Sequence, residues 1–325
     1  MSYATAKIVD AESIPVIDIG ELHGGAPAGL KAVADELARA ASTVGFFYIK
    51  NHGVPQSLID DVFATARAFY SQPLAIKNEV RINPTHRGFL RAGEAKMSDD
   101  ARPDLKESFV WGLDLDDTDP DYRSGRPLAG PNQWPAGLPR MRATFMRYFD
   151  ECNGLGKLLL RAFAASLDIE PDYFIRAFEK PITRCSVIYY PPQPPAMGAE
   201  QFGVAPHSDF GTLTLLYQDN VGGLQVKDAN GDWVTAHPIA GTYVVNVGDL
   251  LARWTNNRFA STEHRVINSS GRERLSCAAF VDPDFDTVIA PVVKAGESAQ
   301  FEPTTAGEYL VRRFGKAFAY RSKTP

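Results

Sequence analysis

The chain has 325 residues, of which 44% are hydrophobic and 22% charged, and its formal net charge is −5. This composition is ordinary for a globular protein, and the length allows a large core in one or two domains. Because no run of 18 apolar residues and no basic block stands out, we expect neither a membrane span nor a nucleic-acid partner. The first residues lack the apolar centre of a signal peptide, so a cytoplasmic location is the default expectation.

The first half of the chain is predicted to be mainly helical. Apolar residues recur at helical spacing in 30–41 and 58–70, and a predicted strand at 45–50 lies between them. The longest predicted helix runs from about 138 to 167 and carries an apolar stripe. Residues 114–139 are rich in Asp, Pro and Gly and are expected to form a long loop.

The pattern changes to short strands from residue 185 onward. Asn230-Gly231 is a strong hairpin signal between two of these strands, and the proline-rich stretch 191–205 is predicted to be a second long loop. Many short, evenly spaced, antiparallel-looking strands are typical of a jelly roll. The predicted strands cover residues 185–190, 212–217, 224–226, 233–236, 243–247, 265–267 and 275–281.

The three cysteines do not indicate a disulfide framework or a zinc site. Cys152, Cys185 and Cys277 are scattered through apolar stretches, and no two of them are close in sequence. Buried free thiols are therefore expected.

A His-x-Asp pair is the most informative feature of the chain. In a strand, His207 and Asp209 would point the same way with Cα atoms about 6.6 Å apart, so both side chains could reach one ion. His264 lies in a second strand-like run. Such a pair often arises by chance, but two histidines and one carboxylate on one face of a metal are the signature of non-haem Fe(II) oxygenases.

Ten residues past His264, a second pair supports this interpretation. Arg274 and Ser276 would share one face of a strand that continues into an apolar run, which argues against a surface salt bridge for Arg274. A guanidinium and a hydroxyl aimed into a cavity suit a carboxylate.

With these residues in place, the chain resembles the isopenicillin N synthase-like family of Fe(II)/2-oxoglutarate-dependent dioxygenases along nearly its whole length. Five ordered segments carry the resemblance. They are Ile14-Pro-Val-Ile-Asp-Ile19, Val44-Gly-Phe-Phe-Tyr-Ile-Lys-Asn-His-Gly-Val-Pro55, Tyr189-Tyr-Pro-Pro192, the Gly248-Asp-Leu-Leu stretch, and Trp254-Thr-Asn-Asn-Arg-Phe-Ala-Ser-Thr-Glu-His-Arg-Val266.

The resemblance implies a mainly β fold with flanking helices: a double-stranded β-helix (jelly roll) core behind a helical N-terminal half. We expect residues 1–325 to form a single oxygenase unit. Within it we expect a helix-rich region at 1–180, the jelly-roll core with the iron site at 181–290, and a C-terminal segment with a helix at 291–325.

The resemblance also implies the site and its cofactors. His207, Asp209 and His264 would bind Fe(II), and Arg274 and Ser276 would hold the distal carboxylate of the co-substrate 2-oxoglutarate. Tyr190 lies where many relatives place a tyrosine that reaches the same carboxylate. The expected reaction consumes O₂, releases succinate and CO₂, and oxidises a small molecule, most simply by hydroxylation.

Substrate contacts are less well marked. Arg87 and Arg91 lie in a segment that covers the substrate in relatives, and Arg87 could instead be a solvated loop charge. Arg184 and Tyr189 enter the core nearby, and these arginines would suit a carboxylate-bearing substrate. Lys106 and Glu107 could also face the cavity, and whether Asn246 points inward depends on strand parity alone.

The remaining histidines, His23, His52, His86 and His237, are predicted to lie outside the metal site, with His52 structural and His23 and His86 exposed.

Two alternatives stay open at this point. An isopenicillin N synthase-type oxidase would use no 2-oxoglutarate, and its Arg-x-Ser pair would receive a carboxylate of a thiol peptide. An inactive binding module could keep the fold without the chemistry. The expected assembly is a monomer or a weak homo-oligomer.

Overall fold

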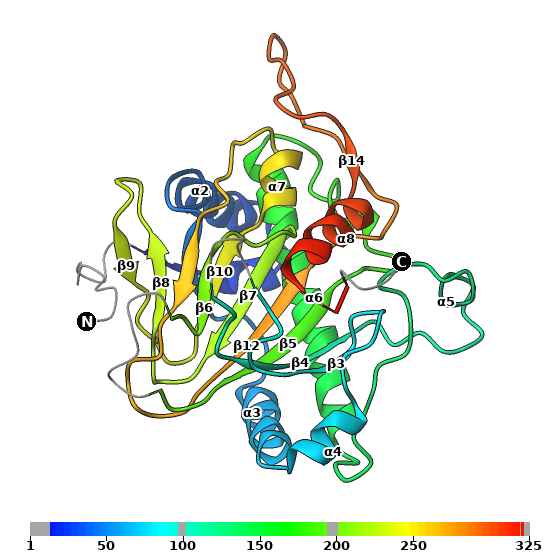
Figure 1. Cartoon of the computed structure of the whole chain (residues 1–325). Coiled ribbons are helices and arrows are strands. Elements are labelled where there is room, and N and C mark those ends of the chain that lie inside the picture. The colour runs from blue at the N-terminus through cyan, green and yellow to red at the C-terminus, as the bar shows by residue number, and fades with distance from the viewer. Residues whose placement is uncertain (1–13, 97–101, 194–200, 319, 322–325) are drawn as a thin grey trace.

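Two β-sheets face each other across a cavity, and helices cover the outer face of the larger sheet (Figure 1). The computed structural model describes residues 14–96, 102–193, 201–318 and 320–321. The helices are α1 (Gly20–His23), α2 (Pro27–Thr43), α3 (Gln56–Tyr70), α4 (Leu74–Glu79), α5 (Pro120–Arg123), α6 (Met141–Ser166), the 3-10 helix η2 (Ile175–Ala177), α7 (Asp249–Trp254) and α8 (Ala306–Ala317). The strands are β1 (Val16–Asp18), β2 (Phe46–Lys50), β3 (Gly88–Leu90), β4 (Glu107–Gly112), β5 (Arg184–Tyr190), β6 (Val204–His207), β7 (Leu213–Gln218), β8 (Leu224–Lys227), β9 (Trp233–Thr235), β10 (Tyr243–Val247), β11 (His264–Val266), β12 (Arg274–Val281), β13 (Val288–Ile289) and β14 (Thr304–Thr305).

The larger sheet has eight strands in the order β1-β2-β10-β7-β12-β5-β4-β3. The β1 and β2 strands are parallel, and every other neighbouring pair in this sheet is antiparallel. Half of these strands come from the first part of the chain and half from the part that begins with β5. The N-terminal region is therefore part of the same sheet as the core that carries the metal motif.

Strand alternation divides the apolar residues of the larger sheet between two cores. On β5, Cys185 and Val187 belong to the core under the helices, whereas Ile188 and Tyr190 belong to the core between the sheets. Successive side chains of a strand point to opposite faces, so a strand of a sheet that is buried on both faces can carry apolar residues at consecutive positions. Each strand thus supplies both the scaffold contact and the cavity wall.

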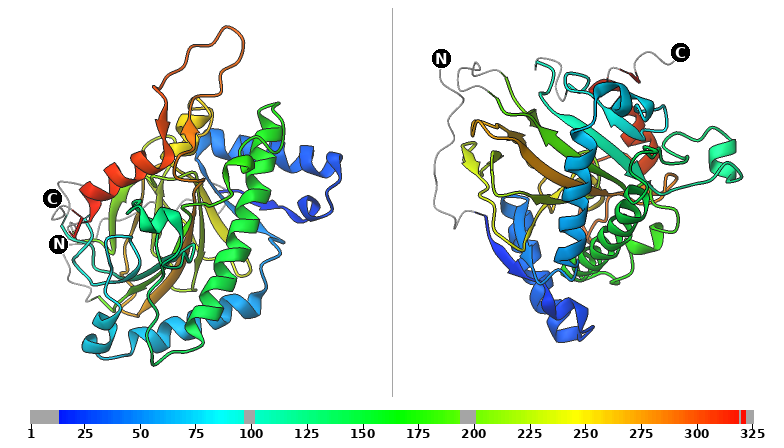
Figure 2. Two further views of the ribbon diagram at one scale, coloured as in Figure 1. Left: turned by 90° about the vertical axis from the view of Figure 1, so that its right-hand side faces the viewer. Right: turned by 90° about the horizontal axis from the view of Figure 1, so that it is seen from below.

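The helix α6 is the main support of the outer face, and α2 and α3 pack against it (Figure 2). Its Gly156 allows this close approach, because a Cβ added there would lie 2.6 Å from Val281 Cγ1 of β12. The predicted helix at 138–167 is confirmed. All three cysteines are buried free thiols, as expected.

The smaller sheet has the order β6-β11-β8-β9. The predicted hairpin is confirmed: β8 and β9 pair antiparallel around a turn in which Gly231 has a φ of +83°. Glycine adopts this left-handed conformation without the steric cost that a Cβ brings. In this sheet β11 pairs directly with β6, which sets the geometry of the metal motif.

The C-terminal part of the chain closes one end of the molecule. The β13 and β14 strands pair with each other, and the chain between them projects away from the body (Figure 1). Thr305 caps α8, since its Oγ1 accepts a hydrogen bond from the backbone N–H of Glu308. Phe314 of α8 and Phe318, just past its end, reach the cavity between the sheets.

The structure departs from the predicted elements in the first half of the chain. The β1, β3 and β4 strands are not among the predicted elements, and the predicted loop at 114–139 contains the short helix α5. Part of the second predicted loop, residues 194–200, lies outside the described residues. No described helix has the length and apolarity needed to cross a membrane.

Candidate active site

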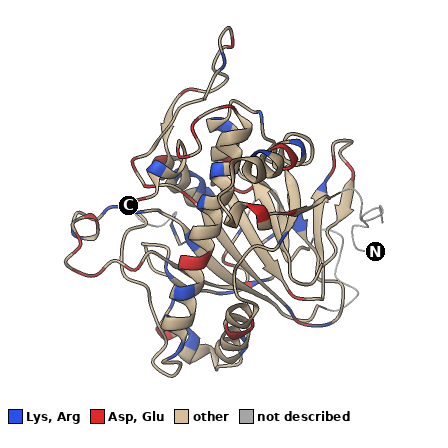
Figure 3. Ribbon diagram, turned by 180° about the vertical axis from the view of Figure 1, so that it is seen from behind, with Lys and Arg blue, Asp and Glu red and all other residues tan. Residues whose placement is uncertain are grey.

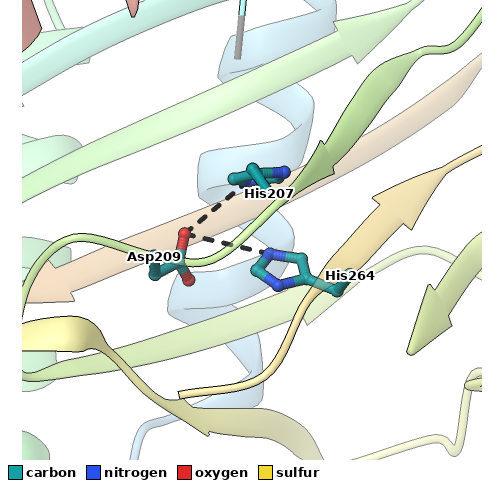
Figure 4. A group of neighbouring side chains, drawn as sticks. All are labelled: His207, Asp209 and His264. Carbon is teal, nitrogen blue, oxygen red and sulfur yellow. Dashed lines mark ion pairs between the residues drawn. The ribbon is translucent and has the colours of Figure 1, made fainter. Parts of the chain in front are cut away.

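Three side chains converge at one end of the paired strands β6 and β11 of the smaller sheet (Figure 4). His207 ends β6, Asp209 lies two residues further on, and His264 begins β11, where it pairs in register with His207. Asp209 Oδ1 is 3.7 Å from His207 Nε2 and 3.8 Å from His264 Nε2. One ligand atom from each residue lies within 4.8 Å of the others, which is the spacing that a single metal ion can bridge.

Hydrogen bonds orient each of the three side chains. The Nδ1 of His207 contacts the carbonyl oxygen of Ala205 at 2.8 Å, and the Nδ1 of His264 contacts that of Thr262 at 3.3 Å. When Nδ1 donates to a carbonyl, the proton is fixed there and the Nε2 lone pair is left for a metal. Both Nε2 atoms accordingly face Asp209.

The carboxylate of Asp209 is oriented from its other side. Asp209 Oδ2 accepts hydrogen bonds from Thr214 Oγ1 at 2.5 Å and from Asn246 Nδ2 at 2.8 Å. Asn246 therefore points into the cavity, which strand parity alone could not decide. With Oδ2 committed to these donors, Oδ1 is the oxygen that faces the two imidazoles.

The electrostatics of the cluster favour the protonation states that a metal needs. Burial, assisted by the neighbouring His264, lowers the pKa of His207 to about 3. Burial raises the pKa of Asp209, but the two imidazoles and the hydrogen bonds from Thr214 and Asn246 outweigh it and lower that pKa overall. Neutral imidazole and ionised carboxylate are the forms that bind a divalent cation.

Arg274 and Ser276 lie on the cavity face of β12. Arg274 is fully buried, and its Nη1 donates to Ser276 Oγ at 3.1 Å. Its other hydrogen bonds go to neutral acceptors, from Nε to the carbonyl of Gly222 at 2.6 Å and from Nη2 to Gln218 Oε1 at 3.2 Å. Within the described residues, no acidic side chain forms an ion pair with Arg274. A buried guanidinium without a counter-ion is costly, so this site is suited to a ligand carboxylate.

The triad and the Arg274–Ser276 pair line one cavity of about 1000 Å³, including its open mouth. Tyr190 also lines it, with its ring centroid 4.6 Å from Arg274 Cζ. The register explains this neighbourhood, because Arg274 of β12 pairs directly with Tyr190 of β5. Every second residue of β12 and β5 faces the same cavity.

The four predicted substrate residues occupy different places. Arg184 lines the cavity and is paired with Asp282 at 2.8 Å. Its Cζ lies 4.5 Å from the ring centroids of both Phe280 and Phe314. Tyr189 is on the opposite face of β5 and stacks on the ring of Tyr70.

The two arginines of the predicted covering segment do not line this cavity. Arg87 is 2% exposed, so it is no solvated loop charge, and its guanidinium donates to backbone carbonyls including that of Leu128 beside a separate, polar cavity. Arg91 donates from Nε to Asn78 Oδ1 at 2.8 Å and is half-buried.

Lys106 and Glu107 are separated by strand alternation. Lys106 lines the cavity, whereas Glu107 points to the opposite face and forms an ion pair with Lys77 at 2.7 Å. The prediction that Lys106 faces the cavity is confirmed, and the same prediction for Glu107 is wrong. Consecutive residues of a strand cannot share a face.

The prediction of an exposed His86 is also wrong. His86 is 3% exposed and stacks on Phe314 at 4.8 Å, next to Phe318. Phe314 and Phe318 belong to the C-terminal helix and the residue just past it, more than 200 positions away in the chain, so local sequence carries no signal for this contact. The other histidines agree with the sequence interpretation: His52 Nδ1 accepts from the backbone N–H of Val54, and His23 and His237 are exposed.

This fold and this site define a non-haem metal oxygenase with a carboxylate-binding pocket. Two family models match the chain. Residues 14–137 match the model described as non-haem dioxygenase in morphine synthesis N-terminal, and residues 182–283 match the 2OG-Fe(II) oxygenase superfamily. The chain belongs to the 2-oxoglutarate–Fe(II) oxygenases, and the isopenicillin N synthase-like family fits it.

Individual relatives support the same family assignment. The chain is 35% identical to the 2-oxoglutarate-Fe(II) type oxidoreductase hxnY of Emericella nidulans, over 95% of this chain and 93% of that protein. It is 33% identical to the homoarginine-6-hydroxylase of Glycine max, over 93% and 96% of the two chains. A solved structure of a full-length Neurospora crassa protein in complex with alpha-KG superposes with a TM-score of 0.84 at 31% identity, covering 94% of this chain and 98% of that one.

The protein is therefore an oxidoreductase that uses Fe(II), 2-oxoglutarate and O₂. The predicted double-stranded β-helix core with flanking helices is confirmed. Membership of this family favours the 2-oxoglutarate-dependent alternative over an oxidase that needs no 2-oxoglutarate and over an inactive binding module.

Proposed function

We propose that this enzyme hydroxylates a small molecule in the cavity between its two sheets. The observation that carries the proposal is the convergence of a His-Asp-His cluster and a buried arginine without an acidic partner among the described residues on one cavity. Solved relatives hold small molecules: the Neurospora crassa protein has been crystallised with alpha-KG together with thymine or 5-formyluracil.

The metal ligands in this proposal are His207, Asp209 and His264. Their donor set of two imidazoles and one carboxylate suits Fe(II) and leaves coordination positions open. When bound, the iron and 2-oxoglutarate supply the oxidising chemistry, with succinate and CO₂ as products. The chain itself fixes the two Nε2 atoms and Asp209 Oδ1 in place through the hydrogen bonds to Ala205, Thr262, Thr214 and Asn246.

Arg274 and Ser276 hold the distal carboxylate of 2-oxoglutarate, and Tyr190 packs over the guanidinium. The hydroxyl of Ser276 already lies within hydrogen-bonding distance of Arg274 Nη1, so both donors are oriented before the ligand arrives. Such preorganisation reduces the ordering cost of binding.

Of the four predicted substrate residues, Arg184 is the one whose side chain lines the cavity. It lines the cavity at the end of β5 that lies farthest from Tyr190, and Asp282 fixes it. Arg87, Arg91 and Tyr189 act at most through the structure around the cavity, given where their side chains lie.

The test is anaerobic titration of the Fe(II)-loaded protein with 2-oxoglutarate, followed by succinate measurement in air. We expect the visible charge-transfer absorption of the Fe(II)–2-oxoglutarate complex and slow succinate release without a substrate. A protein that binds Fe(II) yet shows neither would contradict the assignment of the cavity.

We further predict the domain organisation, the location and the partners of the protein. Residues 1–325 act as one oxygenase unit, with the helix-rich, jelly-roll and C-terminal parts at 1–180, 181–290 and 291–325. The enzyme works in the cytoplasm as a monomer or weak homo-oligomer. It needs no nucleic acid or membrane; in support, basic and acidic residues are interspersed over the described chain (Figure 3).

A further inference from the structure

The co-substrate does not fill the cavity. In the proposed arrangement 2-oxoglutarate runs along β12 from Arg274, beside Tyr190 at one end of β5, to the metal at the end of β6. The half of the cavity lined by β3, β4, the Arg184 end of β5 and α8 is therefore left for the substrate. The chemistry of this second half decides what kind of molecule it can accept.

A buried ammonium group faces this half. Lys106 directly precedes β4, and its side chain points the same way as Ser108 and Val110, which also line the cavity. Only 10% of the Lys106 side chain is exposed. The two residues before Lys106 form hydrogen bonds with the segment that leads to His207. The backbone N–H of Leu105 donates to the carbonyl oxygen of Phe202, and Asp104 Oδ1 accepts from the backbone N–H of Ala205. Lys106 is thus held close to the strand that ends in His207.

The ion pair of Lys106 is loose compared with the other buried pairs. Its Nζ lies 3.4 Å from Asp104 Oδ2, and that oxygen makes no hydrogen bond of good geometry with the described residues. By contrast, Lys77 lies 2.7 Å from Glu107 and Arg184 lies 2.8 Å from Asp282. A buried ammonium with donors to spare is stabilised by a further anionic acceptor.

The charges that line the cavity favour the same conclusion. Among the described lining residues the cations are Lys106, Arg184 and Arg274, and the acid is Asp209. Arg274 is assigned to 2-oxoglutarate, Asp209 to the metal, and Arg184 already has Asp282. Lys106 is therefore the cation in this set with capacity for a substrate anion.

The rest of the substrate half is apolar and aromatic. Leu90 and Val110 line it from β3 and β4, and four phenylalanines contribute from elsewhere in the chain. These rings pack at angles to one another, as in the contacts of Phe314 with Phe210 at 6.1 Å and with Phe318 at 5.7 Å. Such walls accept a flat ring in offset or edge-to-face contact. The four are Phe210, Phe280, Phe314 and Phe318.

We propose that the substrate is a small aromatic carboxylic acid, with its carboxylate on Lys106 Nζ and its ring against the phenylalanines of the substrate half. This inference rests on the proposed function, because the metal and 2-oxoglutarate define which half is free. It assigns Lys106 as the group that selects an acid over its neutral analogue.

The experiment uses the full-length protein loaded anaerobically with Fe(II) and 2-oxoglutarate. Benzoate, phenylacetate, 3-phenylpropionate and cinnamate are titrated, each beside its primary amide, and binding is read from the perturbation of the charge-transfer absorption. We expect at least one acid to bind 10-fold or more tightly than its amide. Lys106→Met should remove this preference by weakening the acid, and Lys106→Arg should keep most of it. Lys316→Met removes the same charge from an exposed position of α8 and should leave the preference unchanged.

The same titrations contain the results that would overturn the inference. If no acid of the panel binds, or acids and amides bind equally to the unmodified protein, the substrate class is wrong whether or not any variant folds. If Lys106→Met weakens 2-oxoglutarate instead, Lys106 serves the co-substrate. Failure of the unmodified protein to bind 2-oxoglutarate would remove the proposed function and this inference together, whereas normal 2-oxoglutarate binding with no acid preference removes the inference alone.

Discussion

Asn246 donates a hydrogen bond from Nδ2 to Asp209 Oδ2 at 2.8 Å, and this contact decides which carboxylate oxygen faces the histidines. Asn246 lies on β10, paired with Thr214 of β7, which donates to the same oxygen. Two adjacent strands of the larger sheet thereby orient Asp209, the proposed metal ligand that follows a strand of the smaller sheet. The geometry of the proposed metal site consequently depends on both sheets.

Asn246→Ala should weaken Fe(II) binding by about 10- to 100-fold, the usual cost of losing a partner that orients a metal ligand. The measurement is the Fe(II) dissociation constant under nitrogen, with Thr214→Ser as the control because it keeps a hydroxyl donor. An unchanged dissociation constant in Asn246→Ala would show that Thr214 alone orients Asp209.

His207→Ala and His264→Ala should each abolish stoichiometric Fe(II) binding and succinate release while leaving a folded protein. The reason is that each removes one of three ligands, whereas the surrounding strands keep their backbone pairing. Metal content and circular dichroism check the two parts of this expectation. His237→Ala, at an exposed histidine, should retain its iron.

Arg274→Ala should raise the dissociation constant of 2-oxoglutarate by about 10- to 150-fold, corresponding to roughly 1.5–3 kcal/mol for hydrogen bonds to a charged group. Fe(II) affinity should change little, because Arg274 does not contact the triad. The matched control is Arg272→Ala, two residues earlier and exposed. Equal 2-oxoglutarate affinities in the two variants would refute the carboxylate role of Arg274.

His86 should make folding stability depend on pH. Burial, together with the nearby Arg184, Arg321 and Arg87, lowers the pKa of His86 well below its usual value of 6.5. Since the unfolded chain binds the proton more readily, the stability due to neutral His86 is complete above about pH 6.5 and is lost as the pH falls, by up to about 1.4 kcal/mol per pH unit.

Urea unfolding of the unmodified protein and of His86→Gln between pH 7.5 and 5 measures this contribution. The difference in free energy of unfolding between the two proteins should shrink as the pH falls. A difference that stays constant with pH would mean that His86 ionises equally in both states. The exposed His237→Gln should follow the unmodified protein.

The candidate metal cluster could be predicted in part from local pattern, whereas the pairing of β11 with β6 that brings His264 beside His207 joins segments far apart in the chain. His207 and Asp209 are two residues apart beside one strand, and the apolar pattern around His264 places that residue on another strand. The carboxylate site follows in the same way, because Arg274 and Ser276 share one face of β12.

The substrate half of the cavity could not be predicted in this way. Its walls depend on contacts between distant segments, such as His86 with Phe314, and on the parity of strands that the apolar pattern does not reveal. Because the sequence did not predict β3 and β4, strand alternation could not be used to show that Lys106 and Glu107 point to opposite faces. The burial of Arg87 has no local signal either, because it depends on the chain near Leu128.

The walls of the cavity come from two different parts of the chain. The proposed metal ligands and the proposed 2-oxoglutarate-binding residues lie on the two sheets or directly beside them, whereas Phe314 and Phe318 are contributed by the last helix and the residues just past it. Exchanging that helix for one of different shape would reshape the chamber around the target molecule and leave the oxidising machinery in place. Substitutions at Phe314 and Phe318 should therefore alter which molecule fits the cavity while leaving His207, Asp209, His264 and Arg274 in place.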